Sequence, residues 1–257
     1  MRPHETSRKI VRNRILASLP AEDFEALRPH LVPIELKRRA IVQEANTPVK
    51  HVHFIESGFM SRVARTHSDG LVEVAIVGRY GFIGIGAALG TMVSLNRTLV
   101  LIPGMALRIC VDDLQSAMRQ RPNIREYLLR YVQSLLLQKS QTALCNVRHE
   151  LEQRLARWML LACERLDEDT LPVTQDLLSM MLGVRRAGVS VALAKFEAEG
   201  LIRKSRGSID VLDVARLEQR ACECYRIIRQ SYDRLLPSLP HDHAIVCQTI
   251  PEKTHSH

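Results

Sequence analysis

Two adjacent arginines, Arg185 and Arg186, follow directly after a Gly183-Val184 step in the chain. A guanidinium can donate to O6 and N7 of one guanine, so an arginine at the start of a helix can read a base pair from the major groove. Residues 183–206 contain six lysines and arginines against two glutamates, a local charge of +4. A patch of this kind is suited to neutralising the phosphates of a nucleic acid.

The elements that must position this arginine pair are two short helices and a hairpin. Thr174 is a good N-cap for a first helix, and Gly183 supplies the left-handed backbone position that ends it. A second helix is expected over residues 185–199, with one buried stripe at i, i+4 and i+7: Val189, Leu193 and Phe196. Residues 201–212 alternate around a basic Arg-Gly turn as a short hairpin would. Together these elements predict a winged helix-turn-helix, whose second helix can enter a major groove.

Two other interpretations fit part of this stretch. A helix, a glycine and a helix also describe a helical hairpin in an ordinary core, beside a solvated basic loop. A ligand-binding regulatory module without a DNA role is a further alternative. The outward arginine pair and the basic hairpin after the second helix favour DNA binding over both.

The cysteines show no pattern typical of a metal site. None of the six has a CxxC partner or metal-ligand spacing: Cys110, Cys145, Cys163, Cys222, Cys224 and Cys247. Cys222 and Cys224 stand two residues apart in a helical pattern, where side chains point apart, so we do not expect them to chelate. Reduced structural thiols are expected, with no metal and no cofactor.

A metal-dependent cupin barrel is the enzyme alternative, because His51-x-His53 with Glu56 faintly resembles a cupin metal motif. On a strand the two histidines share one face and Glu56 points to the other, so a common site would need a bulge. The later part of the motif lacks a histidine and carries Arg108 instead. Solvated strand histidines are therefore the expectation, no residue receives a catalytic role, and the chain is not expected to be an enzyme.

The chain before residue 112 is rich in short strand patterns. A helical lead-in is expected over residues 10–30. Between residues 31 and 111, β-branched runs recur between turn signals, at 51–55, 61–66, 71–77, 98–102 and 106–111. Strands of this length and spacing predict a small antiparallel barrel or jelly roll.

A long helix is expected over residues 124–145. Two apolar strips run along it: Ile124, Leu128, Tyr131 and Leu135, and then Leu129, Val132 and Leu136. One strip can lie on the barrel while the other meets a second copy, which predicts a homodimer. Burial of one broad strip within the monomer is the alternative. Asn146 is the expected hinge before a helix over residues 150–165.

These elements predict an α+β fold with four parts. They are a helical lead-in and β-roll over 1–121, a dimerisation helix and hinge over 122–146, a winged helix-turn-helix over 147–236 and a flexible tail over 237–257. The 257 residues carry a net charge of +8, which is concentrated before residue 147, so whole-chain charge is poor support for DNA binding. The polar, basic start and the lack of a long apolar run predict a cytoplasmic protein without a membrane partner.

A small β-roll, a long helix, a hinge and a winged helix-turn-helix, in this order, resemble the Crp/Fnr family of bacterial transcription regulators. The likeness is strongest over residues 150–212, where LPVTQDLLSMMLGVRRAGVSVALAKFEAEGLI is similar to the family's DNA-binding signature without a gap. In that alignment Arg186 takes the place of the guanine-reading arginine. Ala187 stands where the best-known member has a glutamate that accepts from cytosine N4, so the operator should differ. The resemblance implies a palindromic double-stranded DNA operator, RNA polymerase as a partner, and DNA contacts from Thr174, Gln175, Arg185, Arg186, Gly188, Ser190, Lys204 and Arg206.

The effector half is less similar to the family. YGFIGIGAALG over residues 80–90, followed by Asn96-Arg97-Thr98, resembles the family's phosphate-binding cassette. Ile85 stands where cyclic-AMP binders carry a glutamate that bonds the ribose hydroxyl, so a small anionic effector other than cyclic AMP is expected. An oxygen-sensing iron–sulfur cluster is not expected, because that branch needs clustered N-terminal cysteines and the first here is Cys110. The resemblance gives as pocket candidates Gly84, Ile85, Arg97, Thr98 and Ser140.

Overall fold

The computed structural model describes residues 11–65 and 71–236, and the tail expected over residues 237–257 lies outside them. The chain begins with two short helices and a 3-10 turn: α1 (Arg14–Ser18), α2 (Ala21–Leu27) and η2 (Arg28–His30). Asn13 caps α1 by accepting from the N–H of Leu16. Its amide also donates to the carbonyls of Ile55 and Gly81, both at 2.9 Å. This buried side chain fixes the helical lead-in to the strands that follow.

The N-terminal strands form an antiparallel roll, as predicted. They are β1 (Val32–Leu36), β2 (Ile41–Gln43), β3 (Thr47–Pro48), β4 (His51–Ile55), β5 (Phe59–Arg65), β6 (Leu71–Val77), β7 (Phe82–Ile83), β8 (Val93–Ser94), β9 (Arg97–Ile102) and β10 (Gly104–Cys110). Two four-stranded sheets, in the orders β1-β10-β4-β7 and β2-β9-β5-β6, enclose the core of the roll, and β3 pairs with β8. A short helix, α3 (Ile85–Leu89), interrupts the roll between β7 and β8.

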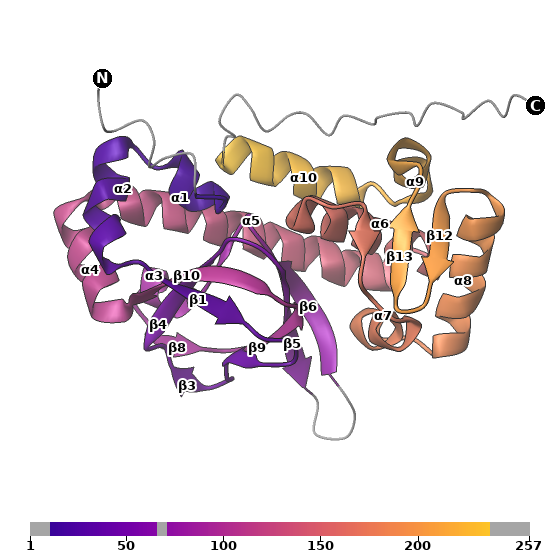
Figure 1. Ribbon diagram of the computed structural model, residues 1–257, viewed down its shortest axis with the longest axis horizontal. Helices are drawn as coiled ribbons and strands as arrows, with labels where there is room; N and C mark the ends of the chain where they lie inside the picture. The colour runs from indigo at the N-terminus through magenta and orange to yellow at the C-terminus, as the bar shows by residue number, and fades with distance from the viewer. Residues whose placement is uncertain (1–10, 66–70, 237–257) are drawn as a thin grey trace, which may run out of the picture.

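Helices connect the roll to the C-terminal part of the chain. They are α4 (Val111–Gln120), α5 (Pro122–Arg148) and α6 (Leu151–Leu166). The C-terminal part then contains β11 (Thr170–Leu171), α7 (Gln175–Leu182), α8 (Arg186–Ala198), β12 (Ile202–Ser205), β13 (Ser208–Val211), α9 (Val214–Arg220) and α10 (Cys224–Leu235). The long α5 runs behind the roll, and α10 lies along it (Figure 1). The predicted roll, long helix and winged helix-turn-helix are confirmed.

Helix α5 differs from the expectation at its C-terminal end and on one face. It continues through Arg148 and is capped by His149, so the helix ends there and not at Asn146. Of the second predicted strip, Val132 is buried in the monomer. Leu136 is 60% exposed, which leaves an outward apolar face on the helix.

Helix α6 packs against both the roll and the C-terminal helices. Eleven of its sixteen residues are buried, which is more than an amphipathic surface helix buries. Trp158 meets the ring of Phe59 edge-on at 5.7 Å between centroids, and its Nε1–H donates to the carboxyl of Glu73 at 2.8 Å. Ser61 donates to the other oxygen of Glu73 at 2.7 Å. This network joins α6 to strands β5 and β6.

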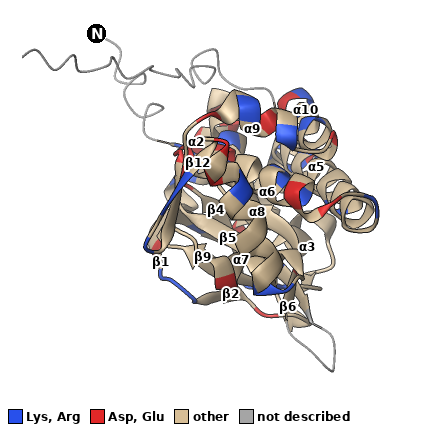
Figure 2. Cartoon of the chain, turned by 90° about the vertical axis from the view of Figure 1, so that its right-hand side faces the viewer, with Lys and Arg blue, Asp and Glu red and all other residues tan. Residues whose placement is uncertain are grey.

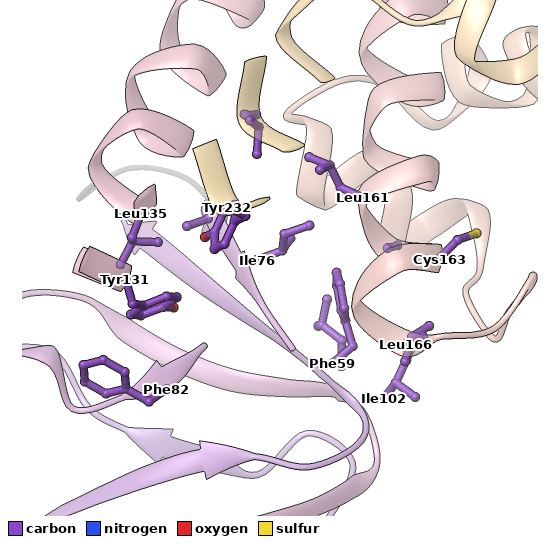
Figure 3. Close-up of a cluster of buried hydrophobic side chains, with 14 of the residues drawn as sticks. Phe59, Ile76, Phe82, Ile102, Tyr131, Leu135, Leu161, Cys163, Leu166 and Tyr232 are labelled. Carbon is purple, nitrogen blue, oxygen red and sulfur yellow. The ribbon is translucent and has the colours of Figure 1, made fainter. Parts of the chain in front are cut away.

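Arginine and tyrosine side chains join the N-terminal lead-in to the last helix. The guanidinium of Arg14 lies 4.4 Å from the ring centre of Tyr80, and that of Arg165 lies 4.6 Å from Tyr80 and 4.4 Å from Tyr232. Arg14 also pairs with Asp233 at 3.4 Å. Around Tyr232, apolar side chains from the roll, α5 and α6 converge on α10 (Figure 3). One continuous core therefore spans the parts predicted as separate units.

Among the residues that the structure describes, no single helix is both long and apolar enough to cross a membrane. In that same part of the chain, α7 and α8 pass the test of length and composition as a pair, but they are bent by 113°.

We expect Glu73→Gln to flatten the dependence of stability on pH. Burial raises the pKa of Glu73 to about 7, even though Ser61, Trp158 and the charge of Arg157 act in the opposite direction. In the unfolded chain a glutamate has a pKa of about 4.3. The native state therefore holds the extra proton between these values, and the free energy of unfolding falls as pH rises towards about 7.

The measurement is chemical denaturation of wild type and variant at intervals from about pH 5 to pH 8. The exposed Glu168→Gln is the matched control and should keep the wild-type slope. If Glu73→Gln also kept that slope, the assignment of the buried proton to Glu73 would be wrong.

Candidate nucleic-acid interface

The helix-turn-helix is built by two local signals that are visible in the sequence. Thr174 is the N-cap of α7, and its hydroxyl accepts from the N–H of Leu177 at 3.2 Å. Gly183 ends α7 with φ of 65°, a left-handed conformation that favours glycine. The angle of 113° between α7 and α8 lies in the range of DNA-binding helix-turn-helix units.

The arginine pair lies at the exposed start of α8. Arg185 is its N-cap residue and Arg186 its first residue. The guanidinium of Arg186 pairs with Asp176 of α7 at 3.1 Å, and the two side chains are 65% and 72% exposed. So exposed a pair contributes little to stability. The ion pair can orient the guanidinium of Arg186, and Arg186 can leave Asp176 when a stronger hydrogen-bond partner is present.

Gln175 and Ser190 orient each other across the turn. The hydroxyl of Ser190 lies 2.6 Å from Oε1 of Gln175, to which it donates, and 3.1 Å from the carbonyl oxygen of Arg186. The structure therefore brings together Gln175, Arg186 and Ser190 at the start of α8, close to the cap residue Thr174.

Gly188, whose contact with DNA stays a prediction, lies where α8 approaches α6. A Cβ built at this position would lie 2.9 Å from Cδ2 of Leu151 in α6. Gly188 therefore allows α8 to approach α6 closely and belongs to the packing of the domain. The helical spacing did not reveal this, because the position of α6 relative to α8 is a tertiary feature.

The two predicted wing residues differ in their availability. Lys204 is held by Glu197, with Nζ at 2.7 Å from Oε2 and the backbone N–H donating to Oε1 at 2.8 Å. These hydrogen bonds lower the pKa of Glu197. Arg206 stands beside Gly207, whose φ of 84° makes the turn, and has no ion pair within the described residues. Arg206 is thus the freer of the two cations for binding a phosphate.

The local positive charge is largely paired within the domain. Of the six basic side chains between residues 183 and 206, four have carboxylate partners: Arg186 with Asp176, Lys195 with Glu152, Arg203 with Asp210 and Lys204 with Glu197. Seen from this end of the molecule, α8 is mostly uncharged, and residues of both signs surround it (Figure 2). Recognition of DNA must therefore depend on specific side chains more than on a strong positive electrostatic field.

Sequence reasoning did not single out Val191. It follows Arg186 by five positions, is 58% exposed and lies on the outward side of α8 with Ala187 and Ala194. An apolar side chain at such a place can contact the methyl group of thymine. The signal that could have identified it is its i+4 spacing from Ala187 on a helix whose inward stripe was already known.

The predicted effector residues are only partly brought together. Gly84 begins α3 with φ of 99°, and Ile85 packs against the core. Thr98 is buried in β9, and Arg97 pairs with Glu44 at 2.8 Å. Ser140 lies on the exposed side of α5. Its neighbour Lys139 contacts the roll instead, donating to Asn96 at 3.0 Å.

A buried cation, Arg62, was missed by the sequence prediction. It is 3% exposed in β5, opposite Thr98 of β9, and its Nε has no hydrogen-bond partner among the described residues. Burial and the charge of Arg62 lower the pKa of Lys139. Two cations therefore lie near Thr98, Arg62 in the roll and Lys139 on α5. Strand periodicity could not reveal this, because the strand is irregular between Arg62 and Val63.

The residues of the cupin alternative have separate structural roles. Glu56 accepts from the backbone N–H groups of Arg12 and Asn13 at 2.8 and 3.1 Å, ahead of α1. His53 is buried rather than solvated, contrary to the prediction, and burial lowers its pKa to about 4.

Three of the cysteines lie close together, although their spacing in the sequence shows no pattern typical of a metal site. Cys145, Cys222 and Cys224 lie together with His149, although 77 residues separate the first two. Residue spacing could not show this, because the cluster depends on how α10 packs along α5.

Comparisons with known proteins agree with this geometry. Residues 153–220 match the sequence profile of the Crp-like helix-turn-helix domain. A CRP-like cAMP-activated global transcriptional regulator of Mycobacterium tuberculosis is 25% identical over 220 residues, which cover 82% of this chain and 98% of that protein.

Solved structures show the same fold at low identity. The c-di-GMP responsive global regulator CLP of Xanthomonas campestris has a TM-score of 0.61 at 17% identity, covering 75% of this chain and 99% of its own. FixK2 of Bradyrhizobium japonicum has a TM-score of 0.63 at 13% identity, covering 75% and 98%. The Mycobacterium tuberculosis protein and CLP are both named as global regulators.

Proposed function

We propose that this chain is a transcription regulator of the Crp/Fnr family that binds an inverted-repeat DNA operator as a homodimer under the control of an effector other than cyclic AMP. The observation that carries the proposal is the exposed start of α8. There Arg186 is oriented by a weak ion pair, with Gln175 and Ser190 beside it.

Different side chains of the domain contact different parts of the DNA. Arg186 can exchange Asp176 for O6 and N7 of a guanine, because a bidentate contact is stronger than an exposed ion pair. Val191, one turn beyond Ala187 on the outward side of α8, supplies an apolar surface for a thymine methyl group. Arg206 in the wing binds phosphate, which positions the domain but carries no sequence information.

The face of α5 that meets the second copy is the one that the monomer leaves uncovered. Leu136 is 60% exposed, Leu144 46% and Val147 81%. Leu129, Leu136 and Ala143 recur every seven residues, and Val147 follows Ala143 by four, as the d and a positions of a heptad repeat do. This spacing favours a two-stranded coiled coil. In such a dimer the two α8 helices read half-sites about one DNA turn apart, roughly 34–36 Å.

We expect Arg186→Ala to weaken binding to the selected operator by about 1–3 kcal/mol and to relax preference at one base pair in each half-site. Arg206→Ala is the matched control, since it removes the same side chain from the wing. It should weaken binding evenly across sequences and lower the salt slope by about 1 for each phosphate that is no longer neutralised. The measurement is fluorescence anisotropy on operator and single-base variants at several salt concentrations. Equal weakening of all sequences by Arg186→Ala would refute base reading.

For the dimer, Leu136→Glu should place like charges opposite each other on the two α5 helices and yield monomers in analytical ultracentrifugation at micromolar concentration. Val32→Glu, at a position 49% exposed on β1, is the control and should stay dimeric. Operator affinity should fall when the dimer dissociates. A wild-type chain that sediments as a monomer, or a Leu136→Glu variant that remains a dimer, contradicts the role of this face.

Cyclic AMP is not expected to be the effector. Ile85 offers the ribose hydroxyl no partner, and burying that hydroxyl unpaired costs about 1–3 kcal/mol, a tenfold to hundredfold loss of affinity. The interior cations Arg62 and Lys139 still favour a small anion. Titration calorimetry with cyclic AMP and cyclic GMP should show no binding at micromolar concentration. Micromolar binding that also raises operator affinity would overturn this expectation.

A further inference from the structure

Three cysteines and one histidine meet where α5 ends. Cys145 lies in the last turn of α5 and His149 is the residue that caps it. Cys222 stands in the connection between α9 and α10, and Cys224 is the first residue of α10. The four ligand atoms all lie within 4.8 Å of one another, and the three cysteines are buried.

Two of the distances between these atoms can be compared with the edges of a tetrahedral site. Sγ of Cys145 lies 3.4 Å from Sγ of Cys222, and Sγ of Cys224 lies 3.7 Å from Nδ1 of His149. Zinc bonds of about 2.3 Å to sulfur and about 2.0 Å to nitrogen give tetrahedral edges of about 3.8 Å and about 3.5 Å. The two measured edges therefore differ from these by a few tenths of an ångström. Side-chain adjustment alone can close that difference.

A carboxylate behind the histidine fixes which ring nitrogen faces the cysteines. Nε2 of His149 lies 3.3 Å from Oε1 of Glu223. A proton held on Nε2 by this carboxylate leaves the lone pair of Nδ1 free to face Cys224. Carboxylate, imidazole and metal in this order are the usual outer arrangement of a histidine ligand.

A buried arginine supplies the charge that such a site needs. Three thiolates with one Zn²⁺ carry a net charge of −1, which Arg157 of α6 can balance, since this arginine is 4% exposed and lies close enough to Cys145 to interact with it electrostatically.

We propose that Cys145, His149, Cys222 and Cys224 bind one Zn²⁺ in a tetrahedral site. Soft thiolate and imidazole ligands in this geometry suit zinc. A Cys145–Cys222 disulfide would account for two of the four residues and leave the orientation of His149 by Glu223 without a function. An iron–sulfur cluster needs ligands spread around several metal and sulfide atoms, and these four are too close together.

The position of the site gives the metal a mechanical role. The site joins the last turn of α5 and its cap residue to the start of α10. It lies at the short connection between α5 and α6. The metal thus fixes the end of the long helix to the C-terminal helices that pack beside the helix-turn-helix domain. Its presence should limit how far α6 and the domain can rotate relative to α5.

The test begins with the full-length wild-type chain. Protein purified without chelator should retain one Zn²⁺ per chain by plasma mass spectrometry. Removal of zinc and titration with Co²⁺ should produce the strong visible d–d bands of tetrahedral cobalt, together with thiolate-to-cobalt charge transfer. Because this readout uses the wild-type protein, it does not depend on how a variant folds.

Variants then assign the ligands. Cys222→Ser and Cys224→Ser should lose stoichiometric zinc, whereas the control Cys110→Ser, at a half-buried cysteine outside the cluster, should retain it. Glu223→Gln keeps all four ligands and should lower zinc affinity about 10–100-fold. Wild-type protein with no zinc and no tetrahedral cobalt spectrum would overturn the proposal. So would a Cys145–Cys222 disulfide, iron with sulfide, or unchanged zinc in both cysteine variants.

Discussion

The burial of α6 on nearly all sides is the constraint on which the rest of the structure depends. A helix with eleven buried residues must be covered by the roll on one side and by the C-terminal helices on the other. Trp158 and Arg157 are polar as well as large, so their partners must be present when the helix is covered. Glu73 meets Trp158 from the roll, and Cys145 meets Arg157 from α5. The helix-turn-helix therefore cannot move without changing contacts with the N-terminal β-roll.

On the proposed function, the same contacts give a path from an effector to DNA. The buried Arg62 of β5 lies near Lys139 of α5, and α5 ends at the proposed metal site beside α6. On the opposite side, a Cβ built at Gly183 of the helix-turn-helix would lie 3.8 Å from Cγ1 of Val72 of β6, and Met181 contacts Ser61 of β5. An anion that shifts β5 relative to α5 would change both contacts with the DNA-binding helices. The coupling would follow a packed path with no flexible linker in it.

Local features of the fold were predictable from the sequence, and features that depend on distant packing were not. Thr174 determines the start of α7 through its side-chain hydroxyl and Gly183 determines its end through its backbone conformation, and the strands are recognised by their alternating pattern. Gly188 looked like a surface residue, because its neighbour Leu151 belongs to another helix. The cysteine cluster joins residues 77 apart through the packing of α10 on α5. Spacing rules detect chelates within one segment and miss those assembled by tertiary structure.

The central claim is that two copies of α8 read DNA by symmetry. Affinity selection of genomic fragments by the full-length protein, at one stated salt concentration near physiological, tests it most directly. We predict enrichment of a single inverted repeat, with half-site centres about 10–10.5 base pairs apart. Enrichment of asymmetric single sites, or no enrichment over bulk DNA, would contradict it.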